Sequence, residues 1–336
     1  MKAMDGKGFM EYTISTGDRV PAGLEREYKD LLDSCGLRDE RDSDFVLLLL
    51  DEEGALAATG ALRGNVLKQI AVSKSMEGQG LCAKVVSELV TEAVSRGESH
   101  LFLYTKPGNE SVFSDLGFCP VVRTEDIVML ENRRNGLDNF LRGLPHLEGK
   151  VGAIVCNCNP FTLGHRRLIE YSAAHCDALL VFVLSEDMSM FPADVRYQLV
   201  QQGTEDLKNV TVVRGGKYVI SRATFPTYFI KKTENCAVAA CELDLRLFAE
   251  RIAPELHISI RFVGQEPFDL VTKQYNEKMK QELPKFGIQV CEIPRYRNIS
   301  ASKVRRLIAE GRVGEAEELL PRVTYDYCRR HFGAGS

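Results

Sequence analysis

The sequence predicts an α/β protein with two domains. Its 336 residues exceed what one hydrophobic core usually needs. From Lys150 onward, short apolar runs alternate with helical patterns, which predicts a doubly wound parallel sheet of the Rossmann-like kind. Before it, consecutive strands lead into a glycine-rich turn and a long helix, which indicates a separate α+β domain. We expect domains at 1–131 and 150–336, joined by a helix and linker at 132–149.

Charge and hydropathy exclude two classes of partner. The formal net charge of −4 argues against a nucleic-acid binder, which usually has a strongly basic domain. The longest apolar runs, 45–50 and 178–184, are far shorter than the roughly 18 residues of a membrane span. We therefore expect a soluble, cytoplasmic protein without nucleic-acid or membrane partners.

Ten cysteines are scattered through the chain without any C-x-x-C pair, which predicts that most are buried thiols and that they form no disulfide framework. Cys156 and Cys158 are one residue apart, and this is not the ligand spacing of a zinc site. We expect no protein-bound metal cluster.

The first half of the chain predicts an α+β order of elements. Helices are expected at 22–36, 81–95, 109–116 and 136–144, and strands at 45–50, 55–62, 66–72, 101–105 and 127–130. Gly78 and Gly80 lie in the turn before the helix at 81–95, where free N–H groups could hold an anion.

Residues 10–131 resemble the GNAT-type acetyltransferases. The resemblance rests on the strand at 67–72, the loop EGQGLC at 77–82 and the segment SVFSDLGF at 111–118. It implies that the loop of Gly78 and Gly80 binds the pyrophosphate of coenzyme A. Glu77 and Cys82 depart from the pattern of that loop, and a carboxylate repels pyrophosphate. The pattern therefore favours the fold over ordinary acetyl transfer from coenzyme A.

The second half predicts a parallel sheet with strands near 151–156, 178–184, 210–213, 260–263 and 288–293. Ligands of such sheets bind beyond the carboxyl ends of the strands. Thr162, Gly164 and His165 follow the first strand and open a helix, and this arrangement predicts a phosphate site. We expect the preceding loop residues Asn159, Pro160 and Phe161 to contact the same ligand. The alternative for His165 is a histidine satisfied within the core.

A second helix start follows the last strand. Ser300 is a good N-cap residue, and Ser302, Lys303 and Arg305 follow in the first turns. Taken alone, this segment is equally typical of an ordinary capped helix with a solvated basic face.

The two helix starts together resemble the nucleotidyltransferase superfamily, with its (H/T)-x-G-H and I-S-x-S/T-x-x-R motifs. Thr162 stands where many members have histidine. The resemblance implies that Thr162 and His165 contact the α- and β-phosphates of ATP. It also implies that Ser300, Ser302, Lys303 and Arg305 hold the phosphates that leave as pyrophosphate, with Mg²⁺ bridging.

A GNAT-like domain fused to such a nucleotidyltransferase resembles the [citrate (pro-3S)-lyase] ligase family. Further stretches fit that family: SED at 185–187 with FP at 191–192 and Arg196, ISRATFPTYFIK at 220–231 and FVGQEPF at 262–268. The resemblance implies an acid-thiol ligase that uses ATP and acetate. Through acetyl-adenylate, it would acetylate the coenzyme A-like arm on the acyl carrier subunit of citrate lyase, releasing AMP and pyrophosphate.

The sequence marks the residues that would bind acetate and adenosine less specifically than it marks the phosphate motifs. Arg222 and Lys231 are candidates for the acetate carboxylate, although surface ion pairs are equally typical of such residues. Gln265 and Glu266, after a strand near the carboxyl edge of the sheet, are candidates for contact with adenosine, although a solvated loop is equally typical of them. We also expect Gly264, just before them, to contact the nucleotide. Three other functions fit parts of the pattern: an adenylyltransferase acting on a phosphorylated cofactor precursor, a GNAT acetyltransferase with a degenerate nucleotide domain, and a nucleotide sensor.

Overall fold

The computed structural model describes residues 11–185, 189–219, 228, 233–266, 270–297 and 299–333. The chain divides into two compact units. The first comprises Met1–Gly136 and Pro226–Ala240, and the second comprises Leu137–Phe225 and Cys241–Ser336. The sequence analysis assigned residues 226–240 to the second domain, whereas the structure groups them with the first unit.

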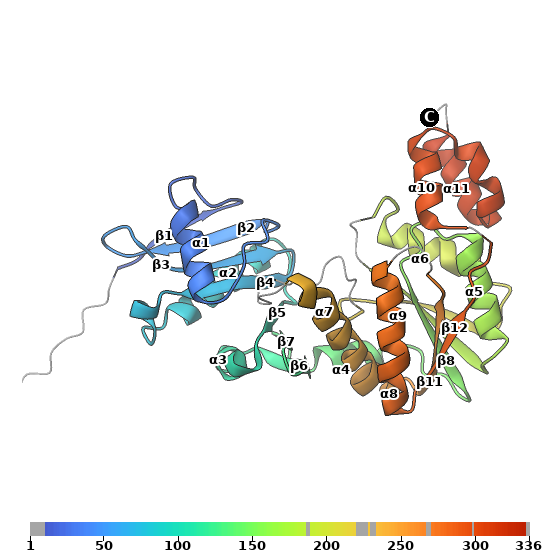
Figure 1. Cartoon of the computed structure of the whole chain (residues 1–336), viewed down its shortest axis with the longest axis horizontal. Helices are drawn as coiled ribbons and strands as arrows, with labels where there is room; N and C mark the ends of the chain where they lie inside the picture. Colours follow the sequence, from blue (N-terminus) through green and yellow to red (C-terminus); the bar gives the residue numbers. More distant parts are fainter. Residues whose placement is uncertain are drawn as a thin grey trace, which may run out of the picture. The chain divides into compact units, whose positions relative to one another are not determined.

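The first unit contains a sheet whose described strands follow the order β1-β2-β3-β4-β5-β7-β6 (Figure 1). The strands are β1 (Thr13–Gly17), β2 (Phe45–Leu50), β3 (Leu56–Arg63), β4 (Val66–Val72), β5 (Phe102–Thr105), β6 (Cys119–Arg123) and β7 (Val128–Glu131). β4 and β5 run parallel, whereas the other neighbouring pairs are antiparallel. This topology confirms the GNAT-like α+β fold that the sequence predicts.

Two helices cover opposite faces of this sheet. The helices of the unit are α1 (Glu25–Ser34), α2 (Leu81–Ser95) and α3 (Glu110–Asp115). Leu47 and Leu49 on β2 pack in the core with α2, whereas Val46 and Leu48 pack in the core with α1. Successive side chains of a strand point to opposite faces, so a strand covered on both faces is apolar throughout. The unbroken run at 45–50 is therefore a consequence of this three-layer arrangement.

The sequence analysis missed the two edge strands, β1 and β6. β1 reads Thr-Ile-Ser-Thr-Gly and is largely exposed, so it lacks the apolar run that marks a buried strand. β6 contains Pro120, a residue that strands accept at the edge of a sheet.

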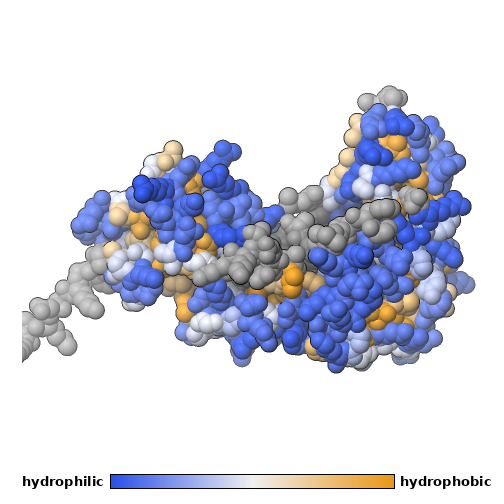
Figure 2. Space-filling model, viewed as in Figure 1, coloured by the Kyte–Doolittle hydropathy of each residue, from blue (hydrophilic) through white to orange (hydrophobic). Residues whose placement is uncertain are grey.

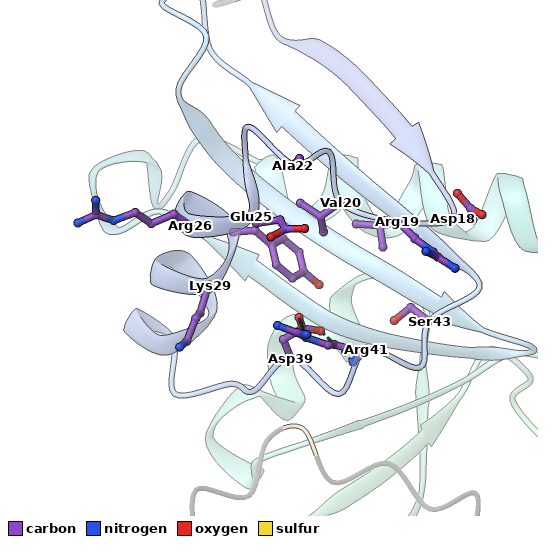
Figure 3. Close-up of a pocket in the computed structure, with 12 residues that line it drawn as sticks. Asp18, Arg19, Val20, Ala22, Glu25, Arg26, Lys29, Asp39, Arg41 and Ser43 are labelled. Atoms are coloured by element: carbon purple, nitrogen blue, oxygen red, sulfur yellow. Dashed lines mark hydrogen bonds and ion pairs between the residues drawn. The ribbon is translucent and has the colours of Figure 1, made fainter.

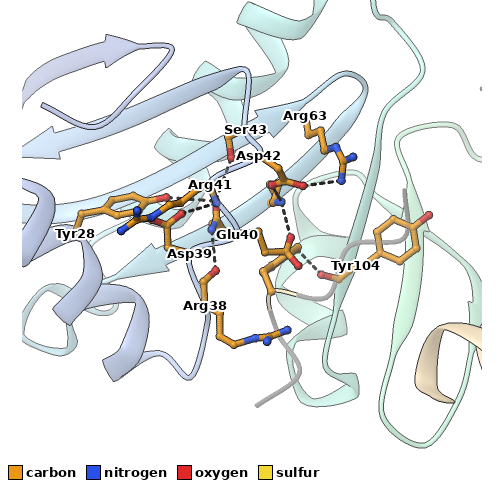
Figure 4. Close-up of polar contacts among 12 residues, drawn as sticks. Tyr28, Arg38, Asp39, Glu40, Arg41, Asp42, Ser43, Arg63 and Tyr104 are labelled. Atoms are coloured by element: carbon orange, nitrogen blue, oxygen red, sulfur yellow. Dashed lines mark hydrogen bonds and ion pairs between the residues drawn. The ribbon is translucent and has the colours of Figure 1, made fainter. Parts of the chain in front are cut away.

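A polar network explains why Tyr228 belongs to the first unit. Figure 4 shows part of this network, around Arg38, Glu40 and Asp42. Lys68 on β4 is fully buried and pairs with Glu40 at 2.6 Å and also with Asp42. Both carboxylates lie in the segment that follows α1, which they fix against the sheet, because a buried ammonium needs paired charges. Arg38 in this segment donates its main-chain N–H to the carbonyl of Tyr228 at 2.7 Å. The Tyr228 hydroxyl donates to the carbonyl of Tyr104 at 2.7 Å.

The second unit contains a sheet whose described strands are all parallel, in the order β10-β9-β8-β11-β12. The strands are β8 (Val151–Cys156), β9 (Ala178–Val183), β10 (Val210–Arg214), β11 (Ile258–Gly264) and β12 (Gln289–Ile293). The helices are α4 (Gly136–Arg142), α5 (Leu163–Ala173), α6 (Ala193–Gln202), α8 (Ala253–Glu255), α9 (Leu270–Glu282), α10 (Ala301–Ala309) and α11 (Arg322–Phe332). A further helix, α7 (Thr233–Leu247), begins in the first unit and belongs to the second unit from Cys241 onward. The predicted doubly wound parallel sheet is confirmed. The first strand of the domain, β8, is central, so both of its neighbours contribute to the edge where its loop emerges.

The main core of the second unit lies on one face of this sheet, between the strands and the helices α5, α6, α10 and α11. On β11, Ile260 and Phe262 point into this core. Arg261 between them therefore points to the opposite face. There, α8 packs on β11 and α9 packs on β12.

Hydrophilic residues cover most of the coloured surface in Figure 2. No helix in the described part of the chain has both the length and the apolar character of a membrane-spanning helix.

The described cysteines are free thiols, but only Cys158, Cys241 and Cys328 are buried. The expectation that most of the thiols are buried is wrong, because many lie at the margins of the cores.

Candidate nucleotide-binding site

Thr162 caps the start of α5, directly after the loop that follows β8. Its side-chain oxygen accepts the main-chain N–H of His165 at 3.4 Å. Its own main-chain N–H donates to Nδ1 of His165 at 3.1 Å. The pair forms a reciprocal capping box in which an imidazole replaces the usual Glu or Gln. The cap orders the first turn of α5, where the N–H groups and the helix dipole favour an anion.

The His165 imidazole is a neutral hydrogen-bond donor. Burial, and secondly the positive charge of Arg295, lower the pKa of His165 from 6.5 to about 4. Because Nδ1 accepts the N–H of Thr162, the hydrogen of the neutral ring lies on Nε2. His165 can therefore donate a hydrogen bond to a phosphate oxygen without changing its own charge.

Arg196 on α6 fixes the loop between β8 and α5. Its side chain is fully buried. Its Nη1 atom donates to the carbonyl and to Oδ1 of Asn157, at 2.9 and 2.7 Å, and to the carbonyl of Leu184 at 2.8 Å. Nε donates to the carbonyl of Phe191 at 3.0 Å. The sequence analysis gave Arg196 no role, although it shares the buried face of α6 with Leu199 and Val200. The signal in the sequence that could have indicated this role is a charged residue at a position of the helix where its neighbours on the same face are apolar.

The second motif is also an ordered helix start. Ser300 is the N-cap residue of α10, and its hydroxyl accepts the main-chain N–H of Lys303 at 3.1 Å. Ser302 donates its hydroxyl hydrogen to Ser300 Oγ at 3.1 Å. The side chains of Ser302 and Lys303 are exposed. Hydroxyl and ammonium donors thus surround the positive end of the α10 dipole.

The two motifs are in direct contact. Arg305 on α10 donates through Nη1 to the carbonyl of Asn159 at 2.5 Å. A Cβ atom at Gly164 would lie 3.7 Å from the carbonyl oxygen of Ile299. The starts of α5 and α10 therefore lie side by side at the carboxyl edge of the sheet, and together they form a two-sided anion site.

The end of β11 lies next to this pair of helices. Gly264 is exposed, and a Cβ atom there would meet no other atom within 4 Å. Glu266 forms an ion pair with Arg295 at 2.6 Å, and Arg295 also donates to the carbonyl of Ile299 at 3.1 Å. Glu266 is thus linked to the second motif, and its contact with adenosine stays a prediction.

The other sequence-predicted residues differ in accessibility. Phe161 is fully buried in the core and Pro160 is buried, so the Phe161 side chain serves packing and only its main chain can face a ligand. Arg222 and Lys231 lie outside the described residues.

Comparisons with known proteins support one family. A family model described as the citrate lyase ligase C-terminal domain matches residues 151–328. A [citrate [pro-3S]-lyase] ligase of Escherichia coli (strain K12) is 41% identical over 298 residues, covering 85% of this chain and 84% of the relative. The chain belongs to the citrate lyase ligase family.

Two solved structures resemble parts of this citrate lyase ligase family member. An acetyltransferase of the GNAT family from Staphylococcus aureus Mu50 covers 36% of this chain and 100% of its own, with 12% identity and a TM-score of 0.31. The NadR protein in complex with NAD and AMP-PNP covers 55% of this chain and 47% of its own, with 21% identity and a TM-score of 0.36.

The GNAT-like unit of the ligase contains the predicted glycine loop. Gly78 and Gly80 both have φ of 79°, a left-handed conformation that glycine adopts without strain. Gly80 is the N-cap residue of α2, and no side chain caps this helix start. Burial raises the pKa of Cys82, in the first turn, which keeps its thiol neutral. The start of α2 therefore has no side-chain cap, and the binding of an anion by the loop of Gly78 and Gly80 stays a prediction.

A hollow of about 800 Å³ lies on the α1 side of the same unit (Figure 3). Its lining includes Arg19, Glu25, Tyr28, Asp39 and Arg41. The charges are of both signs, and Asp39 lies 3.7 Å from Arg41. The sequence analysis predicted no site here, and the mixed lining does not select for a polyanion.

No metal cluster forms among the residues that the structure describes, because no three His, Cys, Asp or Glu side chains are grouped to hold an ion.

Proposed function

We propose that this ligase activates acetate with ATP and acetylates the thiol of the coenzyme A-like arm on the acyl carrier subunit of citrate lyase. A carboxylate oxygen of acetate attacks the α-phosphorus of ATP, and the bond to the bridging oxygen breaks as pyrophosphate leaves. The sulfur of the carrier arm then attacks the acetyl carbonyl carbon. AMP leaves with the bonding electrons, and the proton of the thiol passes to solvent.

The contact between Arg305 and Asn159 carries this proposal. It places two helix starts with exposed donors at one edge of the sheet, whereas an isolated anion site requires only one. Two adjacent anion sites suit a polyphosphate, one for the phosphate that is attacked and the other for those that leave. Fixed donors of this kind stabilise charge that develops on phosphate oxygens without reorganising during the reaction.

The roles of the individual residues follow from their hydrogen-bonding capacity. The His165 Nε2–H and the first-turn N–H groups of α5 donate to the α- and β-phosphates. Ser300, Ser302, Lys303 and Arg305 hold the β- and γ-phosphates and stabilise the departing pyrophosphate. Arg196 contacts no substrate in this scheme, but it positions the loop that ends at Thr162.

Mg²⁺ fits this scheme as an ion carried by the nucleotide. The described groups at the two helix starts include no carboxylate, and their ammonium and N–H donors suit phosphate oxygens and not a cation. Mg²⁺ is commonly bound through substrate phosphates and water. When bound, it supplies further neutralisation of the phosphate charge.

The GNAT-like unit is proposed to bind the carrier arm. The arm contains a pyrophosphate-like anion, and the uncapped start of α2 after Gly80 offers main-chain donors for one. β4 and β5 pair only at Val66–Phe102 and Leu67–Leu103. A small cavity of about 40 Å³, lined by Ile70 and Leu103 among others, lies where these strands diverge. This unit would thus hold the arm whose thiol receives the acetyl group, while the second unit forms the adenylate.

The test is exchange of labelled pyrophosphate into ATP, followed by transfer to the carrier. We expect acetate-dependent exchange without the carrier, and net release of AMP and pyrophosphate once deacetylated carrier is added. His165→Ala should abolish both while circular dichroism shows an intact fold. Exchange that does not require acetate, or normal turnover by a folded His165→Ala variant, would contradict the proposal.

A further inference from the structure

Two thiols are in contact at the carboxyl end of β8, where Cys156 and Cys158 lie on either side of Asn157. The S–H group of Cys158 donates to the sulfur of Cys156 at 3.1 Å. A disulfide has an S–S length of about 2.05 Å, so the two sulfurs lie about 1 Å from bonding distance. The Cα atoms of residues two apart are separated by at most about 7 Å, close to the range that a disulfide spans. The chain therefore needs only a local shift to join these thiols.

One thiol of the pair lies nearer the surface than the other. Cys156 is half-buried and Asn157 is exposed, whereas Cys158 is buried in the main core of the second unit. Burial, and secondly the hydrogen bond to Cys156, raise the pKa of Cys158, which keeps its thiol neutral. A reagent from solution therefore meets Cys156 first, with Cys158 beside it.

The loop at this pair is held in an uncommon conformation by two arginines. Cys158 has φ of 50°, a left-handed conformation that residues other than glycine seldom adopt. Such a conformation persists only where the surrounding contacts fix it. Before Cys158, Arg196 donates to the carbonyl and to Oδ1 of Asn157, at 2.9 and 2.7 Å. After Cys158, Arg305 donates to the carbonyl of Asn159, the contact that joins α10 to the loop before α5.

We propose that Cys156 and Cys158 form a thiol–disulfide modification site that switches the nucleotide site off. The oxidant is a small-molecule disulfide. The thiolate of Cys156 attacks one of its sulfurs, the S–S bond breaks, and one thiol leaves with the bonding electrons. Cys158 then loses its proton to solvent and attacks the Cys156 sulfur, which releases the second thiol. The protein thiols lose two protons and two electrons in all, and the oxidant is reduced to two thiols.

The new bond acts on the site through the loop. It closes a small ring that contains the carbonyl of Asn157, and the ring turns this carbonyl away from Arg196. The shift continues into Asn159, one residue after Cys158, and breaks its bond to Arg305. The starts of α5 and α10 then lose the contact that joins them. This inference rests on the proposed function and adds to it a control by thiol oxidation.

Incubation of the full chain with oxidised glutathione tests the site. Peptide mass mapping should show a loss of about 2 Da in the peptide that contains both cysteines, the mass of the two hydrogens removed. Calorimetric titration should show a Kd for ATP raised about tenfold or more, and dithiothreitol should reverse both changes. An unchanged peptide mass, or a glutathione that stays attached to the wild-type pair, overturns the inference.

Two variants identify the reacting thiols. Cys156→Ala should resist the oxidant, because the remaining thiol is buried, and its Kd for ATP should stay within about twofold of the untreated wild-type value. Cys158→Ala decides the matter if the first variant does not fold. It should retain one glutathione on Cys156, because the thiol that would release it is missing. A folded Cys156→Ala variant that the oxidant still inhibits overturns the inference, as does a Cys158→Ala variant that takes up no glutathione.

Cys176→Ala is the matched control. Cys176 is a half-buried thiol of the same unit, and it donates to the carbonyl of Ser172 at 3.1 Å. This variant should lose ATP affinity on oxidation as the wild type does. A disulfide that forms but leaves the Kd for ATP unchanged contradicts the switch alone. Reduced wild-type protein that binds no ATP contradicts the proposed function and the switch with it, so the two failures are distinguished.

Discussion

Arg305 and Asn159, 146 residues apart, are joined by a hydrogen bond of 2.5 Å between the guanidinium and the main-chain carbonyl. Asn159 also accepts the main-chain N–H of Phe191 through its side chain, at 3.2 Å. The loop before α5 is thus held from two sides before any ligand binds. Preorganised donors cost no reorganisation during the reaction, so this contact assembles the nucleotide site as well as stabilising it.

The first prediction concerns Arg305→Met. We expect kcat/KM for ATP-dependent acetylation to fall about 10²- to 10³-fold, the usual loss for one charge-stabilising donor. The substitution removes both a phosphate contact and the bond to Asn159. Arg306→Met is the control, because Arg306 is exposed on the same helix. Pyrophosphate release measures both variants, and equal losses in the two would mean that general charge, not position, matters.

The second prediction concerns Gly164→Ala. A Cβ atom at this position would meet Thr162 Oγ1 at 3.5 Å and Ile299 at 3.7 Å, which are ordinary contact distances. Alanine is also the better helix former, so the variant should fold and be at least as stable as the wild type. ATP must approach this main chain closely, and we expect its Kd to rise roughly tenfold or more. Calorimetric titration with ATP checks this, and unchanged affinity would exclude close approach of the nucleotide at Gly164.

The third prediction concerns pH and His165. The folded-state pKa is lowered to about 4, so between about pH 6.5 and pH 4 the unfolded chain binds a proton that the native chain does not. Stability is therefore lost as the pH falls through this window, by at most about 1.4 kcal/mol per pH unit from this residue. Urea unfolding of wild-type protein and His165→Gln should differ in slope there and run parallel above about pH 7. Parallel curves throughout would mean that the imidazole is protonated normally.

Much of this site was accessible from sequence because its chemistry is local. Thr162 and His165 are three residues apart, and their capping box needs only the helix they start. Ser300 and Lys303 form the second cap in the same way. The adjacency of the two helices depends on the order of the strands, and the alternation of strands and helices predicted that order only in outline.

The residues that the sequence analysis missed act over long distances. Arg196 lies among apolar residues on the buried face of α6, where a pattern of hydropathy registers only an interruption. The bonds of Arg196 go to three separate main-chain segments, and no spacing within α6 indicates them. Tyr228 joins the first unit through the carbonyl of Tyr104, 124 residues away. Such contacts become visible only when the tertiary structure is known.

The last prediction separates the two steps of the reaction by placing a charge at the start of α2. Ala83 is exposed in the first turn of this helix, after Gly80. In Ala83→Glu the carboxylate stabilises the helix by about 0.3–1 kcal/mol through the dipole, but it repels a pyrophosphate at the same main-chain donors. We expect acetate-dependent pyrophosphate exchange to be unchanged and the KM for the carrier to rise about tenfold. Ala83→Gln, which has the same size without the charge, should show neither effect. A carrier KM that is equal in the two variants would place the arm elsewhere, because charge at the α2 start would then be irrelevant to its binding.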